Sequence, residues 1–187
     1  MSFFEMPAWQ PPSGYRIPTW LRPPEAMVPG IVPVELLVAR TDTHAVLVTD
    51  LHAYPTGLEF TLTGRSRPDL PDPRRHDPDR PPHLRFAYRN AWLELHFADG
   101  RTADNDPRRW PRPSGDQPPD PPLLYQSTVG EDGGHVWLWG LPPPGPLTFA
   151  CQWPAEQIPP SQALLDARLV LAAAARAQTL WPEEPRA

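Results

Sequence analysis

Histidine side chains are the first residues in this sequence that could build a metal centre. The chain has six of them. No two stand at the H-x-H spacing of a strand ligand pair or the H-x-x-x-H spacing of a helical pair. We therefore expect surface or strand-edge histidines, and we predict no metal and no cofactor. The six are His44, His52, His76, His83, His96 and His135.

Aspartate is concentrated in loops, where it alternates with arginine. In the range 66–82, the run DLPDPRRHDPDR carries carboxylates and guanidinium groups in nearly equal number. It lacks the fixed ligand spacing of a calcium loop. This mixture predicts a solvated loop whose charges neutralise one another, in preference to a cation site.

Nucleophilic chemistry and phosphate binding have no supporting motif. No G-x-S-x-G sequence occurs, and the serines lie in proline-rich turns. The single cysteine, Cys151, alternates with Phe149 and Trp153, which predicts a core thiol and not a reactive thiolate. The glycines of the range 130–134 precede a strand, so they cannot use a helix N-terminus to bind phosphate. We predict no catalytic residue.

Tryptophan is the unusual resource of this chain, with eight residues. Trp137, Trp139 and Trp153 lie on predicted strands joined by a short proline-rich connector, and pairing of those strands would make some rings cross-strand neighbours. Either the C-terminal helix or the N-terminal arm covers this aromatic face, or the face is exposed to a partner. Arg85 and Arg89 could stack on an exposed platform. These five residues form the predicted interaction surface.

Short runs of alternating apolar and polar residues predict the strands that must position these side chains. The clearest run places Leu58, Phe60 and Leu62 on one face. Asp99 and Gly100 form a dipeptide typical of hairpin turns. The predicted strands start near residues 31, 45, 58, 84, 93, 123, 136 and 147.

The last predicted element is a helix over residues 161–177. Ser161 follows two prolines and is the expected N-cap. Leu165, Leu169 and Ala172 stand at i, i+4 and i+7, and the following alanines have high helix propensity. We expect Trp181, just beyond the helix, to fold back onto the domain.

Together these elements predict a mainly β protein. We expect one antiparallel β-sandwich, Ig-like or jelly-roll-like, with one C-terminal α-helix packed on it. The sandwich domain spans residues 31–182 and includes proline-rich loops at 66–82 and 104–122. Residues 1–30 form a proline-rich N-terminal arm that lies across the domain, binds a partner or stays loose.

Composition narrows the class of partner. The chain has 187 residues with a net charge of −5, which argues against a nucleic-acid partner. No run approaches the roughly 18 apolar residues of a membrane helix, so we expect no membrane insertion. The N-terminus lacks the features of a signal peptide, which leaves the cytoplasm as the expected location.

All 17 basic residues are arginine and 31 residues are proline, a bias typical of GC-rich bacterial genomes.

Several segments together carry a family resemblance. They are VPVELLVARTD, LHAYPTGLEFTL, LELHFADGR, VWLWGLPPPGPLTFACQWP and a terminal helix ending in LWP. This set resembles a group of uncharacterised actinobacterial proteins with a single β-rich domain and a C-terminal helix. The resemblance covers most of residues 20–182 and is most specific at 137–154. It implies a single domain, and because the group has no established activity it implies no catalytic residue.

The sequence leaves two functions open. The first is a non-enzymatic protein-interaction module that uses the aromatic strands and the proline-rich segments to bind another protein. The alternative is a small-molecule-binding or enzymatic β-sandwich with a pocket lined by tryptophan and histidine. The oligomeric state has no signal in the sequence.

Overall fold

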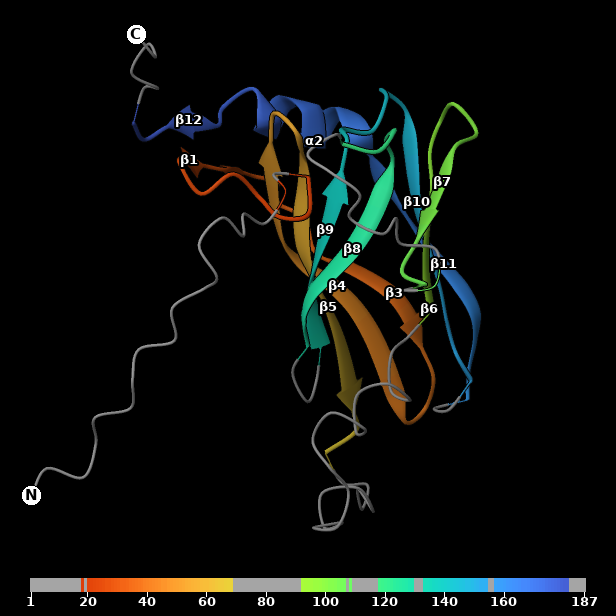
Figure 1. The fold of residues 1–187 in the computed structure, drawn as a ribbon. Helices are drawn as coiled ribbons and strands as arrows, with labels where there is room; N and C mark the ends of the chain where they lie inside the picture. Colours follow the sequence, from red (N-terminus) through yellow and green to blue (C-terminus); the bar gives the residue numbers. More distant parts are fainter. Residues whose placement is uncertain are drawn as a thin grey trace, which may run out of the picture.

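The structure is a computed structural model that describes residues 18, 20–68, 92–106, 108, 118–129, 133–154 and 157–181. Most of the two predicted proline-rich loops lies outside these residues, as do most of the N-terminal arm and His76, His83, Arg85 and Arg89. The described chain folds into antiparallel β-sheets and one short helix, arranged as two facing layers (Figure 1). The predicted β-sandwich with a C-terminal helix is confirmed.

The larger layer is a six-stranded sheet in the order β2-β4-β5-β9-β8. Strand β3 pairs with β4 alongside β2, so that β2 and β3 share one edge of that long strand. The bounds are β2 (Gly30–Ile31), β3 (Leu36–Arg40), β4 (His44–Tyr54), β5 (Gly57–Ser66), β8 (Leu123–Val129) and β9 (Gly133–Trp139).

The smaller layer is a four-stranded sheet in the order β11-β10-β6-β7. Its bounds are β6 (Trp92–His96), β7 (Thr102–Asp104), β10 (Pro146–Trp153) and β11 (Ile158–Asp166). The turn between β6 and β7 contains Gly100 at φ 85°, as expected from the Asp-Gly dipeptide. From β4 onward, the hairpins alternate between the sheets: β4–β5 and β8–β9 belong to the larger sheet, and β6–β7 and β10–β11 belong to the smaller one.

Apolar side chains from both sheets meet between the layers. On β5, Leu58 and Phe60 are fully buried and Leu62 is 5% exposed, so the predicted period-two strand is confirmed. Phe60 packs edge-on against Phe149 of the opposite sheet, with 5.5 Å between ring centroids and 81° between planes. Burial of this apolar surface is the main stabilising contribution to such a sandwich.

The two tryptophan-bearing strands do not pair with each other, which corrects one expectation. β9 pairs with β5 and β8, whereas β10 pairs with β6 and β11 in the other sheet. The connector between them carries three consecutive prolines, which lack the N–H groups of a tight hairpin. Gly140 at φ 91° and Gly145 at φ 127° turn the chain at its two ends. The connector therefore crosses between layers.

The C-terminal helix begins later than residue 161 and is shorter than predicted. Residues 158–166 form β11, in which Ala163 pairs with Phe149 and Leu165 with Leu147. Helix α2 spans Ala167–Ala174, and its N-cap is Asp166, whose carboxylate accepts a hydrogen bond from the Arg168 N–H. Pairing with β10 satisfies the backbone of residues 161–166 and outweighs their helix propensity.

Helix α2 covers the end of the large sheet where β2 and β4 meet (Figure 1). The approach is close, because a Cβ atom added at Gly30 would lie 1.8 Å from the carbonyl oxygen of Ala173. After the helix, β12 (Gln178–Thr179) pairs with β1 (Met27–Val28). Trp181 is 67% exposed, so the expectation that it folds back onto the domain is wrong. The helix in the described residues is too short to cross a membrane.

Candidate functional site

Trp137 belongs to the packed interior of the protein and not to an exposed platform. It lies on the outer face of β9, as the alternation with buried Val136 and Leu138 predicts, yet only 1% of its surface is exposed. Its indole N–H donates a buried 3.0 Å hydrogen bond to the carbonyl oxygen of Trp20 in the N-terminal arm. Tyr54 packs edge-on against its ring at 5.7 Å. The arm therefore contacts Trp137, and this residue is not exposed to a partner.

The other two tryptophans of the predicted surface, Trp139 on β9 and Trp153 on β10, each contact residues of the domain. Trp139 is half-buried, and its indole N–H donates to the Pro119 carbonyl oxygen at 3.3 Å. The Trp153 ring packs against Gly64 so closely that a Cβ atom added to this glycine would lie 2.6 Å from the ring. Trp153 lies on the other sheet and forms no continuous aromatic surface with Trp137, whereas Trp139 lies two residues from Trp137 on β9. Arg85 and Arg89 lie outside the described residues.

The described histidines are spread over the fold. His44 and His52 lie on β4, His135 on β9 and His96 on β6 of the other sheet. His52 and His96 each have a glutamate nearby, with closest nitrogen–oxygen distances of 4.0 Å and 3.4 Å. Within the described residues, no group of three histidine, cysteine or carboxylate side chains could hold a metal ion.

Cys151 lies in the core between the sheets and is 2% exposed. Burial raises the pKa of its thiol to about 12, because the thiolate would lose its hydration there. The group is therefore protonated at neutral pH. This agrees with the interpretation of Cys151 as a core residue.

A concave site is formed at the turn between β3 and β4. The turn is stabilised by Thr41, whose N–H donates to the His44 carbonyl oxygen at 2.8 Å. The Thr41 hydroxyl oxygen accepts the N–H of His44 at 3.1 Å and that of Thr43 at 3.3 Å. Such side-chain bonds to a nearby backbone are typical of threonine in turns. They give the rim of the site a fixed backbone.

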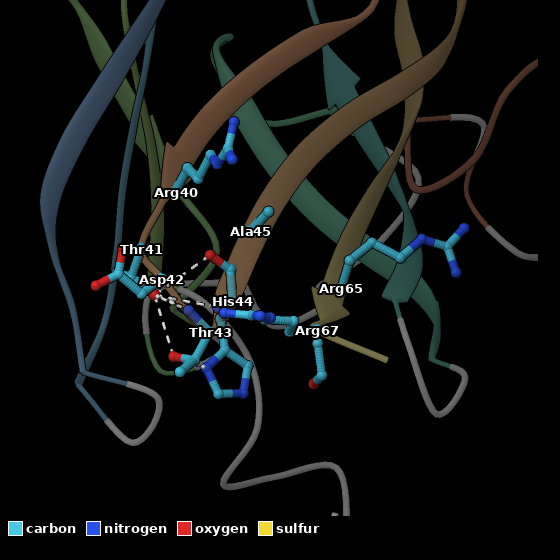
Figure 2. A pocket seen from close by; sticks show the side chains of 9 residues that line it. Arg40, Thr41, Asp42, Thr43, His44, Ala45, Arg65 and Arg67 are labelled. Atoms are coloured by element: carbon cyan, nitrogen blue, oxygen red, sulfur yellow. Dashed lines mark hydrogen bonds between the residues drawn. The ribbon is translucent and has the colours of Figure 1, made fainter. Parts of the chain in front are cut away.

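The end of β5 completes the site from the other side. The Arg67 N–H donates to the Thr43 carbonyl oxygen at 2.8 Å, which ties the chain after β5 to the turn. The resulting hollow has a volume of about 420 Å³. We call it the arginine hollow; it is lined by Arg40, Thr41, Asp42, Thr43, His44, Ala45, Arg65, Ser66 and Arg67 (Figure 2).

Two arginines of this hollow stand in one row across three strands. Arg40 pairs with Ala45, and Ala45 pairs with Arg65. Directly opposite residues project from the same face of a sheet, so both guanidinium groups rise on the side of Ala45. This side faces away from the core, because the next residues, Val46 and Gly64, face the opposite sheet. Figure 2 shows Arg40 and Arg65 on either side of Ala45.

The charges of the hollow are predominantly positive. Three arginines stand against one carboxylate, that of Asp42. The side chains of Arg40 and Arg65 are exposed, and neither guanidinium group forms a hydrogen bond or an ion pair within the described part of the chain. Arg67 and His44 each take part in interactions of their own. In a chain with a net charge of −5, this is a local concentration of cationic donors.

Guanidinium groups in this arrangement can bind oxyanions. Each presents parallel N–H donors that match the two oxygens of a carboxylate. The polar groups of the turn, including the Thr43 hydroxyl at 2.9 Å from the His44 Nδ1, add hydrogen-bonding capacity at the rim. Among the described residues that line the hollow, no group of three side chains could hold a metal ion. The arrangement favours binding.

Sequence reasoning did not identify the arginine hollow. Arg40 precedes a polar turn, Arg65 ends the clearest predicted strand, and Arg67 begins the predicted loop that follows it, so the local signals were present. What brings them together is the register between β3, β4 and β5. Register depends on pairing across the sheet and shifts at a bulge between Leu37 and Ala39, which no local pattern specifies.

No family model matches the chain, and neither a curated protein nor a solved structure was found to match it. The resemblance to actinobacterial β-rich proteins therefore stays a prediction.

Proposed function

We propose that this protein is a non-enzymatic protein-interaction module and that the arginine hollow is its binding site. One observation carries the proposal. The side chains of Arg40 and Arg65 are exposed and form no hydrogen bond or ion pair within the described residues. They flank the small side chain of Ala45 on one face of the sheet. Arginine is enriched at protein interfaces, where its planar group combines stacking with bidentate hydrogen bonding.

The location of the hollow supports a role in binding another protein. It lies at the end of the sandwich opposite helix α2, next to the edge strand β3 (Figure 1). The two arginines project from strands, and strands hold side chains in a more fixed geometry than loops do. This surface replaces the aromatic strands as the proposed contact, since Trp137 is buried and its indole N–H is already bonded to the Trp20 carbonyl oxygen.

Site-specific photocrosslinking in cells of the source organism tests this proposal. A photoreactive phenylalanine analogue replaces Ser66, which lines the hollow, in one variant. In the control variant it replaces Gln162, an exposed residue of β11 in the other sheet. We expect a discrete protein adduct from position 66 that is missing from position 162, and the captured protein should bind the purified chain in a reciprocal pull-down. Identical adduct patterns from both positions, or none from either, would overturn the proposal.

A further inference from the structure

We infer that the arginine hollow recognises an acidic segment of the partner protein, with one carboxylate paired to Arg40 and a second paired to Arg65. This inference rests on the proposed function, because it names the chemistry of the partner at that same site. It extends the proposal from the presence of a binding surface to the charge and spacing of its ligand.

The spacing of the two arginines sets the spacing of the acidic groups. Arg40 and Arg65 are separated by one strand, at Ala45. Neighbouring strands lie about 4.8 Å apart, so the two backbones are roughly 10 Å apart. An extended chain rises about 3.3 Å per residue. Because side chains of an extended chain alternate between its two faces, two carboxylates four residues apart, about 13 Å, point to the same side and lie within reach of the two long arginine side chains.

Ala45 makes room for such a segment. Its side chain is the smallest in the row and lies between two long ones. Ala45 lines the hollow of about 420 Å³ together with the residues of the β3–β4 turn. A larger residue at this position would fill the space between the guanidinium groups without altering either charge. Ala45 therefore offers a steric test that is independent of electrostatics.

The charges favour an acidic protein over other anions. A phosphate group concentrates its charge at one point, whereas the cations here are distributed along a row. A nucleic acid would be repelled by the net charge of −5 that the whole chain carries. A short acidic segment needs only the local field, because charges separated by more than about 8 Å are largely screened at physiological salt.

The test uses the full-length chain labelled with ¹⁵N and a synthetic peptide, Gly-Gly-Glu-Gly-Gly-Gly-Glu-Gly-Gly, with blocked termini. Nuclear magnetic resonance follows the Nε–Hε signal of each arginine during titration. We expect the signals of Arg40 and Arg65 to shift and that of Arg168, at the start of α2, to stay unchanged. The analogue with glutamine in place of both glutamates should cause no shift. Raising the salt concentration should weaken binding.

Substitutions then separate charge from shape. Arg40→Gln and Arg65→Gln should each raise the dissociation constant about twofold to fivefold, as expected for exposed ion pairs. Arg168→Gln, which removes the same charge at the other end of the fold, should leave it unchanged. Ala45→Leu should weaken binding with all charges retained. All four positions lie outside the buried core, so the variants should fold.

The outcomes distinguish this inference from the proposed function. If the Ser66 crosslink captures a partner but the acidic peptide shifts neither Arg40 nor Arg65, the acidic-segment inference is wrong and the interaction module stands. Tighter binding of a phosphoserine peptide or of a DNA duplex would also overturn the inference. If neither the crosslink nor the peptide gives a signal, both proposals fail.

Discussion

The indole N–H of Trp137 and the backbone carbonyl of Trp20 form a buried 3.0 Å hydrogen bond across 117 residues of sequence. This contact closes the outer face of β9 with a segment that precedes the first strand. Trp20 is 2% exposed, so its ring is as deeply buried as the side chains between the sheets. A residue of the proline-rich arm is thus an integral part of the packed domain.

Replacement of Trp20 should destabilise the protein strongly. We expect Trp20→Ala to lower the free energy of unfolding by about 3–5 kcal/mol, because it removes a large ring that is 2% exposed. Urea denaturation measures the change. The matched control is Trp181→Ala, which removes the same side chain where it is 67% exposed and should cost less than about 0.5 kcal/mol. Equal costs for the two variants would show that Trp20 does not anchor the arm.

The close approach of α2 to β2 gives a second stability prediction. Gly30→Ala places a methyl group against the Ala173 backbone, where its Cβ atom would lie 1.8 Å from the carbonyl oxygen. Helix and strand must then move apart, and we expect a loss of roughly 1–3 kcal/mol, as for overpacking. Thermal unfolding should show a lower midpoint. Ile31→Ala, at the neighbouring 64% exposed position, should change stability little. A Gly30→Ala variant as stable as the parent would contradict the packing described.

The strand content of this fold follows from local pattern, and its sheet assignment does not. The alternation of Leu58, Phe60 and Leu62 depends only on the period of an extended chain, so it is visible in the sequence. Whether the strand of Trp137 pairs with that of Trp153 depends on contacts with distant strands. The prolines between them exclude a tight hairpin, yet they do not specify which sheet receives each strand.

The helix boundary shows the same limit in a different form. Both Ser161 and Asp166 are good N-cap residues, and the apolar residues between them fit either a helix or a strand. Pairing with β10 decides in favour of a strand. The arginine hollow was missed for a related reason, since Arg40 and Arg65 become neighbours only through strand register.

A pair of capping variants tests where the helix begins. Asp166→Ala removes the carboxylate that accepts the Arg168 N–H at 2.9 Å, and we expect a loss of about 1 kcal/mol. Ser161→Ala removes a hydroxyl that bonds only to the Pro159 carbonyl at an exposed position, and it should be nearly neutral. Chemical denaturation of both variants gives the comparison. A larger cost for Ser161→Ala would instead favour a helix starting at residue 161.

Cys151 should be unreactive in the folded protein and should make stability fall at alkaline pH. Burial raises the pKa of its thiol from the ordinary 9.0 to about 12, so between these values the unfolded chain has lost a proton that the folded chain keeps. Stability is therefore fully present below pH 9 and decreases as pH rises toward 12, by up to about 1.4 kcal/mol per pH unit. The Cys151→Ala variant should lack this contribution to the fall of unfolding free energy with pH. Tyr54, whose pKa burial also raises, contributes equally to both proteins.

A disulfide-exchange reagent at pH 8 should label the Cys151 thiol only after unfolding in urea. Rapid labelling of the native protein, or identical alkaline slopes for the two proteins, would show that the thiol is accessible to water.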